Sequence, residues 1–157
     1  MEHRELERLS LPQLADRLQD LDGRRTPVGW VPDDAVERQA IERCILAQVA
    51  AEQPGADALR CDLQIGLRSK EQAVTARVRA LGPGGVMIDA PGRWIVGTHV
   101  EMRVDSETDE QGLRVRGVIR EIAAGTLRVS VGEQPSEGHE RRLRRFVLDL
   151  LRHRMDS

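Results

Sequence analysis

Aromatic side chains are scarce in this chain. They make up 2% of its 157 residues, as two tryptophans, one phenylalanine and no tyrosine. Proteins that bind single-stranded nucleic acids stack the bases on aromatic side chains, so the composition argues against that function. The hydrophobic core has to be built from valine, leucine, isoleucine and alanine.

Cysteines and long apolar runs are also rare. Cys44 and Cys61 are the only cysteines, and neither belongs to a CxxC pair or lies near a histidine cluster. We therefore expect two buried thiols rather than a disulfide or a metal site. No stretch reaches the roughly 20 apolar residues of a membrane-spanning helix, and the charged N-terminal segment is unlike a signal peptide. These absences predict a soluble, cytoplasmic protein with no membrane insertion.

Neither sign of charge is in excess, since 24 basic and 26 acidic residues give a net charge of -2. Duplex-binding proteins usually carry a basic excess on one face, which makes nucleic acid an unfavoured partner. The four histidines are scattered and belong to no catalytic motif, so we expect no enzyme, no metal and no cofactor. The acidic stretch 105–110 lacks the glycine of a calcium loop and predicts a hairpin tip.

The first third of the chain has helical periodicity. Leucines recur at spacings of three and four over residues 11–21, with Ser10 as the expected N-cap and Gly23 as the stop. A second helix is expected from Asp33 or Asp34 to residue 52, and 53–57 is expected to be a linker. The apolar stripe of this second helix should be formed by Val36, Ala40, Ile41, Cys44, Ile45, Gln48 and Val49. Trp30, between the two helices, is a candidate partner contact, or it closes a local contact between the helices.

From residue 59 the periodicity changes to two. Six alternating runs lie at 59–67, 73–81, 84–90, 98–106, 112–122 and 126–133, and glycine, proline and polar turns separate them. Short strands at this spacing indicate an antiparallel barrel or a compact sandwich. Gly117 falls inside the fifth run, where it could mark a bend.

A last helix is expected over residues 136–155, capped by Ser136. Leu143, Phe146, Val147, Leu150 and Leu151 form its apolar stripe, which should pack on the sheet. The arginine-rich outer face would then be exposed. Arg142 and Arg145 on it are candidate contacts for a partner protein, and this face is also where phosphate backbone would bind if the protein were a nucleic-acid-binding barrel.

Taken together, the patterns predict an α+β, mainly β protein. We expect an N-terminal helical region and linker at 1–57, and a β-barrel with a C-terminal helix at 58–157. The segments "RVRALGPGGVMIDAP", "GTHVEMRVD", "VRGVIREI" and "RRLRRFVLDLL" occur in an order that resembles the PilZ domain. This bacterial module is a six-stranded antiparallel barrel, and many of its members bind cyclic di-GMP.

The resemblance implies a ligand site, and the sequence departs from it. The family places Arg-x-x-x-Arg before the first strand and Asp/Asn-x-Ser-x-x-Gly after the second. Here Arg60 matches the second arginine but Ala56 replaces the first. In the second motif Ala80 and Gly82 replace the acid and the serine, and only Gly85 agrees.

These departures predict an adaptor in cyclic di-GMP or motility signalling. It would act by protein–protein contact, with a possible homo-oligomer through its helices and with weak or no nucleotide binding. The alternative is a true cyclic di-GMP receptor with a rearranged set of arginines. Its ligand residues would be Arg60, Arg68, Gly82, Gly84 and Gly85.

Overall fold

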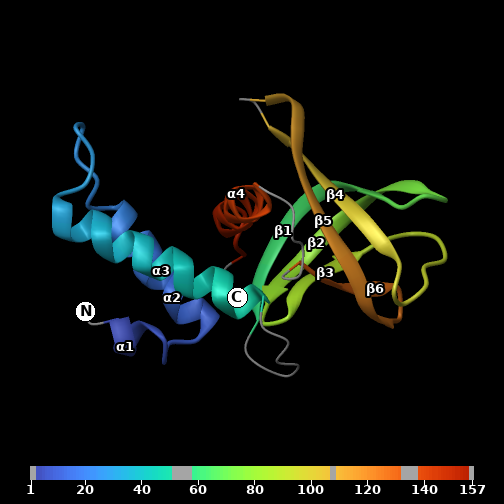
Figure 1. Cartoon of the computed structure of the whole chain (residues 1–157), viewed down its shortest axis with the longest axis horizontal. Helices are drawn as coiled ribbons and strands as arrows, with labels where there is room; N and C mark the ends of the chain where they lie inside the picture. Colours follow the sequence, from blue (N-terminus) through green and yellow to red (C-terminus); the bar gives the residue numbers. More distant parts are fainter. Residues whose placement is uncertain (1–2, 51–57, 107–108, 132–137, 156–157) are drawn as a thin grey trace.

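Helices and strands occupy different parts of the chain. The structure is a computed structural model, and it describes residues 3–50, 58–106, 109–131 and 138–155. A β-barrel forms one end of the molecule and helices α1 to α3 form the other, with α4 between them (Figure 1). Among the described helices, none has the length and apolar character needed to cross a bilayer.

The N-terminal helices are α1 (His3–Leu6), α2 (Leu11–Asp22) and α3 (Pro32–Ala50). The prediction for α2 is confirmed. Ser10 caps it with a capping box to Gln13, Gly23 follows it, and its four predicted leucines are buried. A capping box satisfies backbone N–H groups that have no partner inside the helix, so α2 begins where the sequence says it should.

Helix α3 differs from its prediction in which side chains it buries. It begins at Pro32, and Val36, expected in the apolar stripe, is 69% exposed. Ile41, Ile45 and Val49 are buried as expected, whereas Glu42, which the stripe left out, is only 4% exposed. The first turns of α3 contact α2 through ion pairs, such as Arg17 with Glu37, and its buried apolar side chains lie in its second half.

The barrel is closed and antiparallel, with strand order β1-β2-β3-β6-β5-β4. This confirms the predicted six-stranded fold. Pairing of Gly66–Arg68 in β1 with residues 101–103 in β4 completes the ring. The strands are β1 (Leu59–Arg68), β2 (Ala73–Gly82), β3 (Gly85–Asp89), β4 (His99–Ser106), β5 (Asp109–Ala123) and β6 (Thr126–Ser130).

Gly117 lies where β5 closely approaches β6, and the bend predicted there stays a prediction. A Cβ atom on Gly117 would lie 2.5 Å from Cγ1 of Val129 and 2.7 Å from the carbonyl oxygen of Ser130. These separations are shorter than real Cβ contacts, so the glycine allows close packing against β6.

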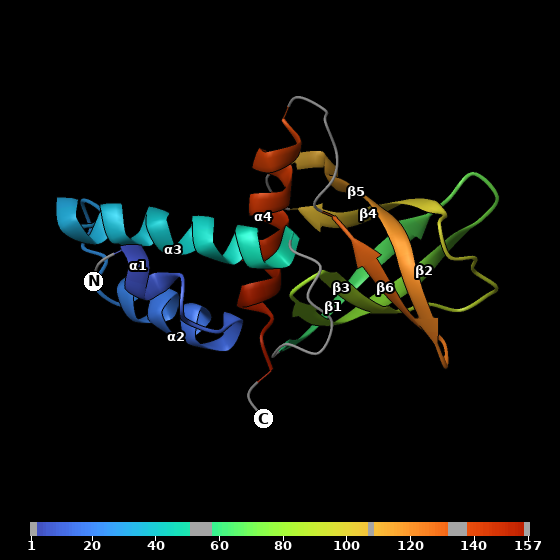
Figure 2. The same cartoon turned by 60° about the horizontal axis from the view of Figure 1, so that its bottom comes forward.

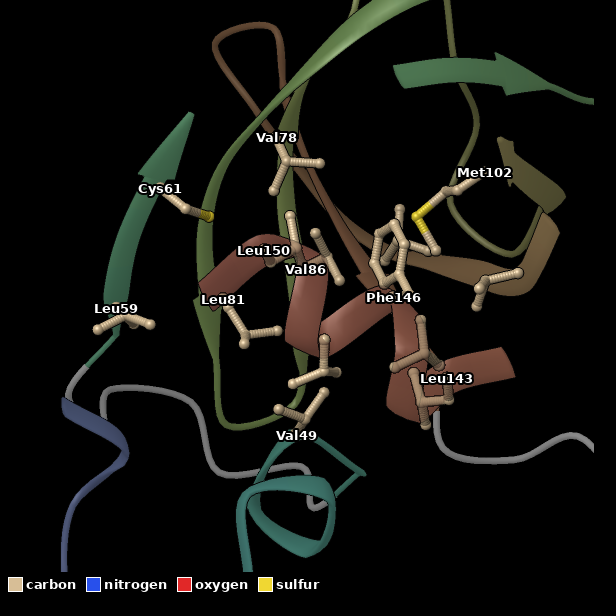
Figure 3. Packing of buried hydrophobic residues seen from close by; sticks show 14 of the residues in the cluster. Val49, Leu59, Cys61, Val78, Leu81, Val86, Met102, Leu143, Phe146 and Leu150 are labelled. Carbon is tan, nitrogen blue, oxygen red and sulfur yellow. The ribbon is translucent and has the colours of Figure 1, made fainter. Parts of the chain in front are cut away.

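Helix α4 (His139–Arg152) lies against the barrel and fills its core from one side. Phe146 and Leu150 are fully buried and lie among barrel side chains such as Met102 and Val86 (Figure 3). The helix starts later than predicted, with Gly138 rather than Ser136 as its N-cap residue. Residue 136 and the predicted linker at 53–57 lie outside the described residues.

Candidate functional site

The glycine-rich turn joins β2 to β3. Gly82 pairs with Gly85, which leaves Pro83 and Gly84 at the tip. Gly84 and Gly85 have φ angles of 92° and 129°, a region that other residues rarely adopt. A turn of this kind can present backbone N–H groups to a phosphate, so what surrounds it decides whether it is a ligand site.

The protein itself fills the space around this turn. A Cβ atom on Gly85 would lie 2.0 Å from the carbonyl oxygen of Val129, because β6 packs directly against it. The Arg128 Nη1 donates a hydrogen bond to the Gly84 carbonyl oxygen at 3.2 Å. Gly82, Gly84 and Gly85 are all buried. The small size of Gly85 serves the packing of β3 on β6, whereas Gly82 approaches Ala58.

The two arginines predicted to complete a ligand site lie far apart. Arg60 is exposed near the start of β1 and pairs in register with Ala80, close to the turn. Arg68 is at the last position of β1, roughly 25 Å along the strand at about 3.3 Å per residue. The structure thus brings Arg60, but not Arg68, to the end of the barrel where Gly82–Gly85 lies.

Other arginines at this part of the barrel already have partners. Arg77 donates a hydrogen bond to Asp62 at 2.5 Å, and Arg79 donates one to Asp89 at 2.7 Å. These hydrogen bonds hold the pKa of Asp62 and of Asp89 below the ordinary value of 3.8, with help from the Thr126 hydroxyl at Asp89. The sequence alone does not predict these partners, since cross-strand pairs depend on register.

The C-terminal segment also covers the start of β1. After α4, the backbone N–H of Met155 donates to Arg60 O at 2.9 Å, and that of Asp62 donates to His153 O at 3.0 Å. Arg154 forms an ion pair with Asp16 of α2 at 2.5 Å. Arg60 matches the second arginine of the family's first motif, so this segment is hydrogen-bonded to the backbone at that residue.

Trp30 makes contacts within the chain. Its Nε1 donates a hydrogen bond to Leu21 O at 3.0 Å, and the guanidinium groups of Arg25 and Arg38 lie 5.1 and 4.8 Å from the ring centroid. Cation–π contacts of this kind hold the half-buried ring in place. The local role foreseen for Trp30 is thus present, and its role toward a partner stays a prediction.

Arg142 and Arg145 are exposed on α4, as expected for its outer face. Their neighbour Arg144 lies on a different side of the helix and forms a 2.5 Å ion pair with the buried Glu42 of α3. Arg38 also pairs with Glu42. The burial of Glu42 is therefore explained by two guanidinium partners, one of them distant in sequence.

Both thiols are buried, as predicted. Cys44 and Cys61 are free and buried. Burial raises the pKa of Cys61 to about 12, and it raises the pKa of Cys44 as well, with Glu7 adding to the effect. Because the thiolate is the reactive form, neither is suited to catalysis. Within the described ranges, no group of three histidine, cysteine or acidic side chains could hold a metal ion.

The fold defines a small closed β-barrel module with a helix packed against it. The PilZ domain family model matches residues 37–149, well over half of the chain, and the chain belongs to this family. The match begins inside α3 and ends inside α4. A comparison with curated proteins gives no match. At the level of the family, membership implies signalling related to cyclic di-GMP.

Proposed function

We propose that this chain is a non-enzymatic PilZ adaptor of the bacterial cytoplasm, which acts by contact with another protein and binds cyclic di-GMP weakly or not at all. The pathway is cyclic di-GMP or motility signalling. PilZ domains are generally non-enzymatic, and they commonly interact with proteins. The proposal that this member binds cyclic di-GMP weakly or not at all rests on the residues around the glycine-rich turn.

One observation carries the proposal: apart from Arg60, the arginines of the neighbouring strands β2 and β6 are used within the protein. Arg77, Arg79 and Arg128 pair with carboxylates of the barrel, and Gly85 is packed against β6. The family's acid, serine and first arginine are replaced at Ala80, Gly82 and Ala56.

The magnitude of this loss decides against strong binding. Each missing hydrogen bond to a charged group costs about 1.5–3 kcal/mol. Three such losses weaken a micromolar site by several orders of magnitude, at about 1.4 kcal/mol per factor of ten.

Calorimetric titration with cyclic di-GMP tests the proposal. We expect no saturable binding at micromolar concentrations, for the intact chain and for Arg60→Ala alike. Saturable micromolar binding that is lost in Arg60→Ala and kept in Arg43→Ala would establish the alternative, a true receptor. Arg43 is the matched control because it is an exposed arginine on α3, away from the turn.

The contact surface we assign to the partner lies at the loop between α2 and α3. Val28 is 98% exposed, and Val31 and Val36 are also exposed. Trp30 holds this loop to α2 through its hydrogen bond to Leu21 O. Apolar side chains held on a fixed loop can form the centre of a small protein interface.

Photo-crosslinking in the host cell tests this surface. A photoreactive amino acid at position 28 should give a discrete adduct of higher mass. The same amino acid at the exposed position of Glu71, on the β1–β2 turn, should give none. Absence of the adduct at position 28, or equal adducts at both positions, would contradict the assignment.

A further inference from the structure

A groove of about 520 Å³ lies between the first half of α4 and the β4–β5 pair. Figure 2 shows this half of α4 beside the two strands. The groove is far more basic than the chain as a whole. Its charged lining residues are Arg114, Arg116, Arg141, Arg142, Arg145 and Glu101.

Regular secondary structure places these arginines together. In β5, Arg114 and Arg116 alternate with buried Leu113 and Val115, so both side chains are on the outer face of the barrel. In α4, residues 141 and 145 are one turn apart and share one flank of the helix. The groove is therefore lined by guanidinium groups on two elements that pack against each other.

Within the described residues, three of these guanidinium groups form no ion pair, unlike Arg77 and Arg79 near the glycine-rich turn. Arg114 lies 3.9 Å from Glu101, the only acidic residue of the described lining. Over the described parts of the chain, Arg116, Arg141 and Arg145 form no ion pair. Close positive charges repel one another, and an anion between them relieves that repulsion.

We propose that this groove binds a small ligand with two or three adjacent phosphoryl groups. Guanidinium groups bind phosphate oxygens through paired hydrogen bonds, and several of them around one groove suit a short chain of phosphates. The volume lies in the usual range for small-ligand sites. Gly138, the N-cap residue of α4, is also part of the lining, so the positive end of the helix dipole is at the same place.

The lining of the groove also indicates that the ligand does not need a nucleobase. No aromatic side chain is among the described lining residues, so nothing there would stack on a base. We therefore expect recognition of the phosphates themselves, with little contribution from a nucleoside. The net charge of -2 disfavours a long duplex, which would also approach the acidic parts of the surface. This site does not depend on the proposed function, because it is separate from the glycine-rich turn.

Titration of the full-length protein with inorganic tripolyphosphate at low salt tests the proposal. We expect saturable binding that weakens as salt is added. The double substitution Arg141→Glu and Arg145→Glu should weaken it by about a hundredfold or more, from at least tenfold per lost charged contact. Arg43→Glu changes the charge away from the groove and should change affinity by less than about threefold. Equal losses in the double variant and in Arg43→Glu would overturn the site.

Glu101→Gln gives a result in the opposite direction. It removes the acidic group of the described lining, so tripolyphosphate should bind several-fold more tightly. Unchanged or weaker binding would count against the proposal, and this variant does not require any arginine to be removed. ATP should bind about as tightly as tripolyphosphate. Absence of saturable tripolyphosphate binding by the unmodified protein, or tighter binding of duplex DNA than of tripolyphosphate, would refute it.

Discussion

Gly85→Ala is the substitution that most directly tests how the glycine-rich turn is used. If the glycine makes room for β6, the methyl group will destabilise the fold. If it makes room for a ligand, the fold will tolerate the change and only binding will suffer. The two roles therefore predict different measurements.

The expected loss has two sources in the structure. The new Cβ would lie 2.0 Å from the carbonyl oxygen of Val129, so β3 and β6 must separate where Val86 pairs with Val129. Overpacking of this kind costs about 1–3 kcal/mol. The φ of 129° at residue 85 adds a further 1–3 kcal/mol or so of backbone strain for alanine. The sum, about 2–6 kcal/mol, is a large part of the 5–15 kcal/mol that is typical of whole proteins.

Chemical denaturation and thermal melting measure the effect. We expect the free energy of unfolding to fall by about 2 kcal/mol or more, and Tm to fall by about 5 °C or more. Gly97→Ala is the matched control, since Gly97 has a φ of 94° but no atom within 4 Å of its added Cβ. It should lose only the strain. A loss in Gly85→Ala no larger than in Gly97→Ala would refute the packing argument and reopen the turn as a ligand site.

The titratable groups give further predictions. Burial raises the pKa of Cys61 to about 12, so the native protein at pH 8 should leave this thiol unlabelled by iodoacetamide, whereas the unfolded protein should react quickly. The stability due to this raised pKa is present below pH 9 and should decline as pH rises from there, which Cys61→Ala would abolish. The pKa values of Asp62 and Asp89 are lowered, so their contribution to the free energy of unfolding is present above pH 3.8 and is lost as pH falls. The double variant Asp62→Asn, Asp89→Asn should therefore lose less stability on acidification than the unmodified protein. Glu42→Ala leaves two guanidinium groups without their buried carboxylate and should lose about 1–3 kcal/mol in denaturation, while exposed Glu71→Ala should lose almost nothing.

Local signals in the sequence were enough to predict most of the fold. Ser10, Pro12 and Gly23 act on the backbone within a few residues of themselves. They therefore predict the ends of α2 whatever the helix packs against. The strands follow from strict alternation, because one face of each strand is buried inside the barrel. The hydrophobic pattern therefore contains both the type and the approximate length of these elements.

The misplaced details all depend on contacts between distant segments. The spacing of α3 gives Val36 and Ile41 the same apolar value, but only Ile41 has a neighbour to cover it. Glu42 is polar by composition, yet it is buried because Arg144 of α4 reaches it. The sequence predicts a bend at Gly117, and only the position of β6 beside it shows the close packing that this glycine allows. The neighbour that covers Ile41, the Arg144 partner of Glu42 and the β6 residues beside Gly117 all come from other elements, so local patterns do not predict these contacts.

The same reasoning explains why arginine spacing alone is a poor guide to anion binding here. Arg77 and Arg79 on β2 look as available in the sequence as Arg141 and Arg145 on α4. Strand register brings Asp62 to Arg77 and Asp89 to Arg79. Arg141 and Arg145 instead line a groove together with arginines of β5. An internal carboxylate competes with an external anion for an arginine, which makes Arg77 and Arg79 less available than Arg141 and Arg145. Among the described residues of this PilZ domain, Arg116, Arg141 and Arg145 line one groove without an ion pair, so the phosphate binding proposed there does not depend on the family motif near β2.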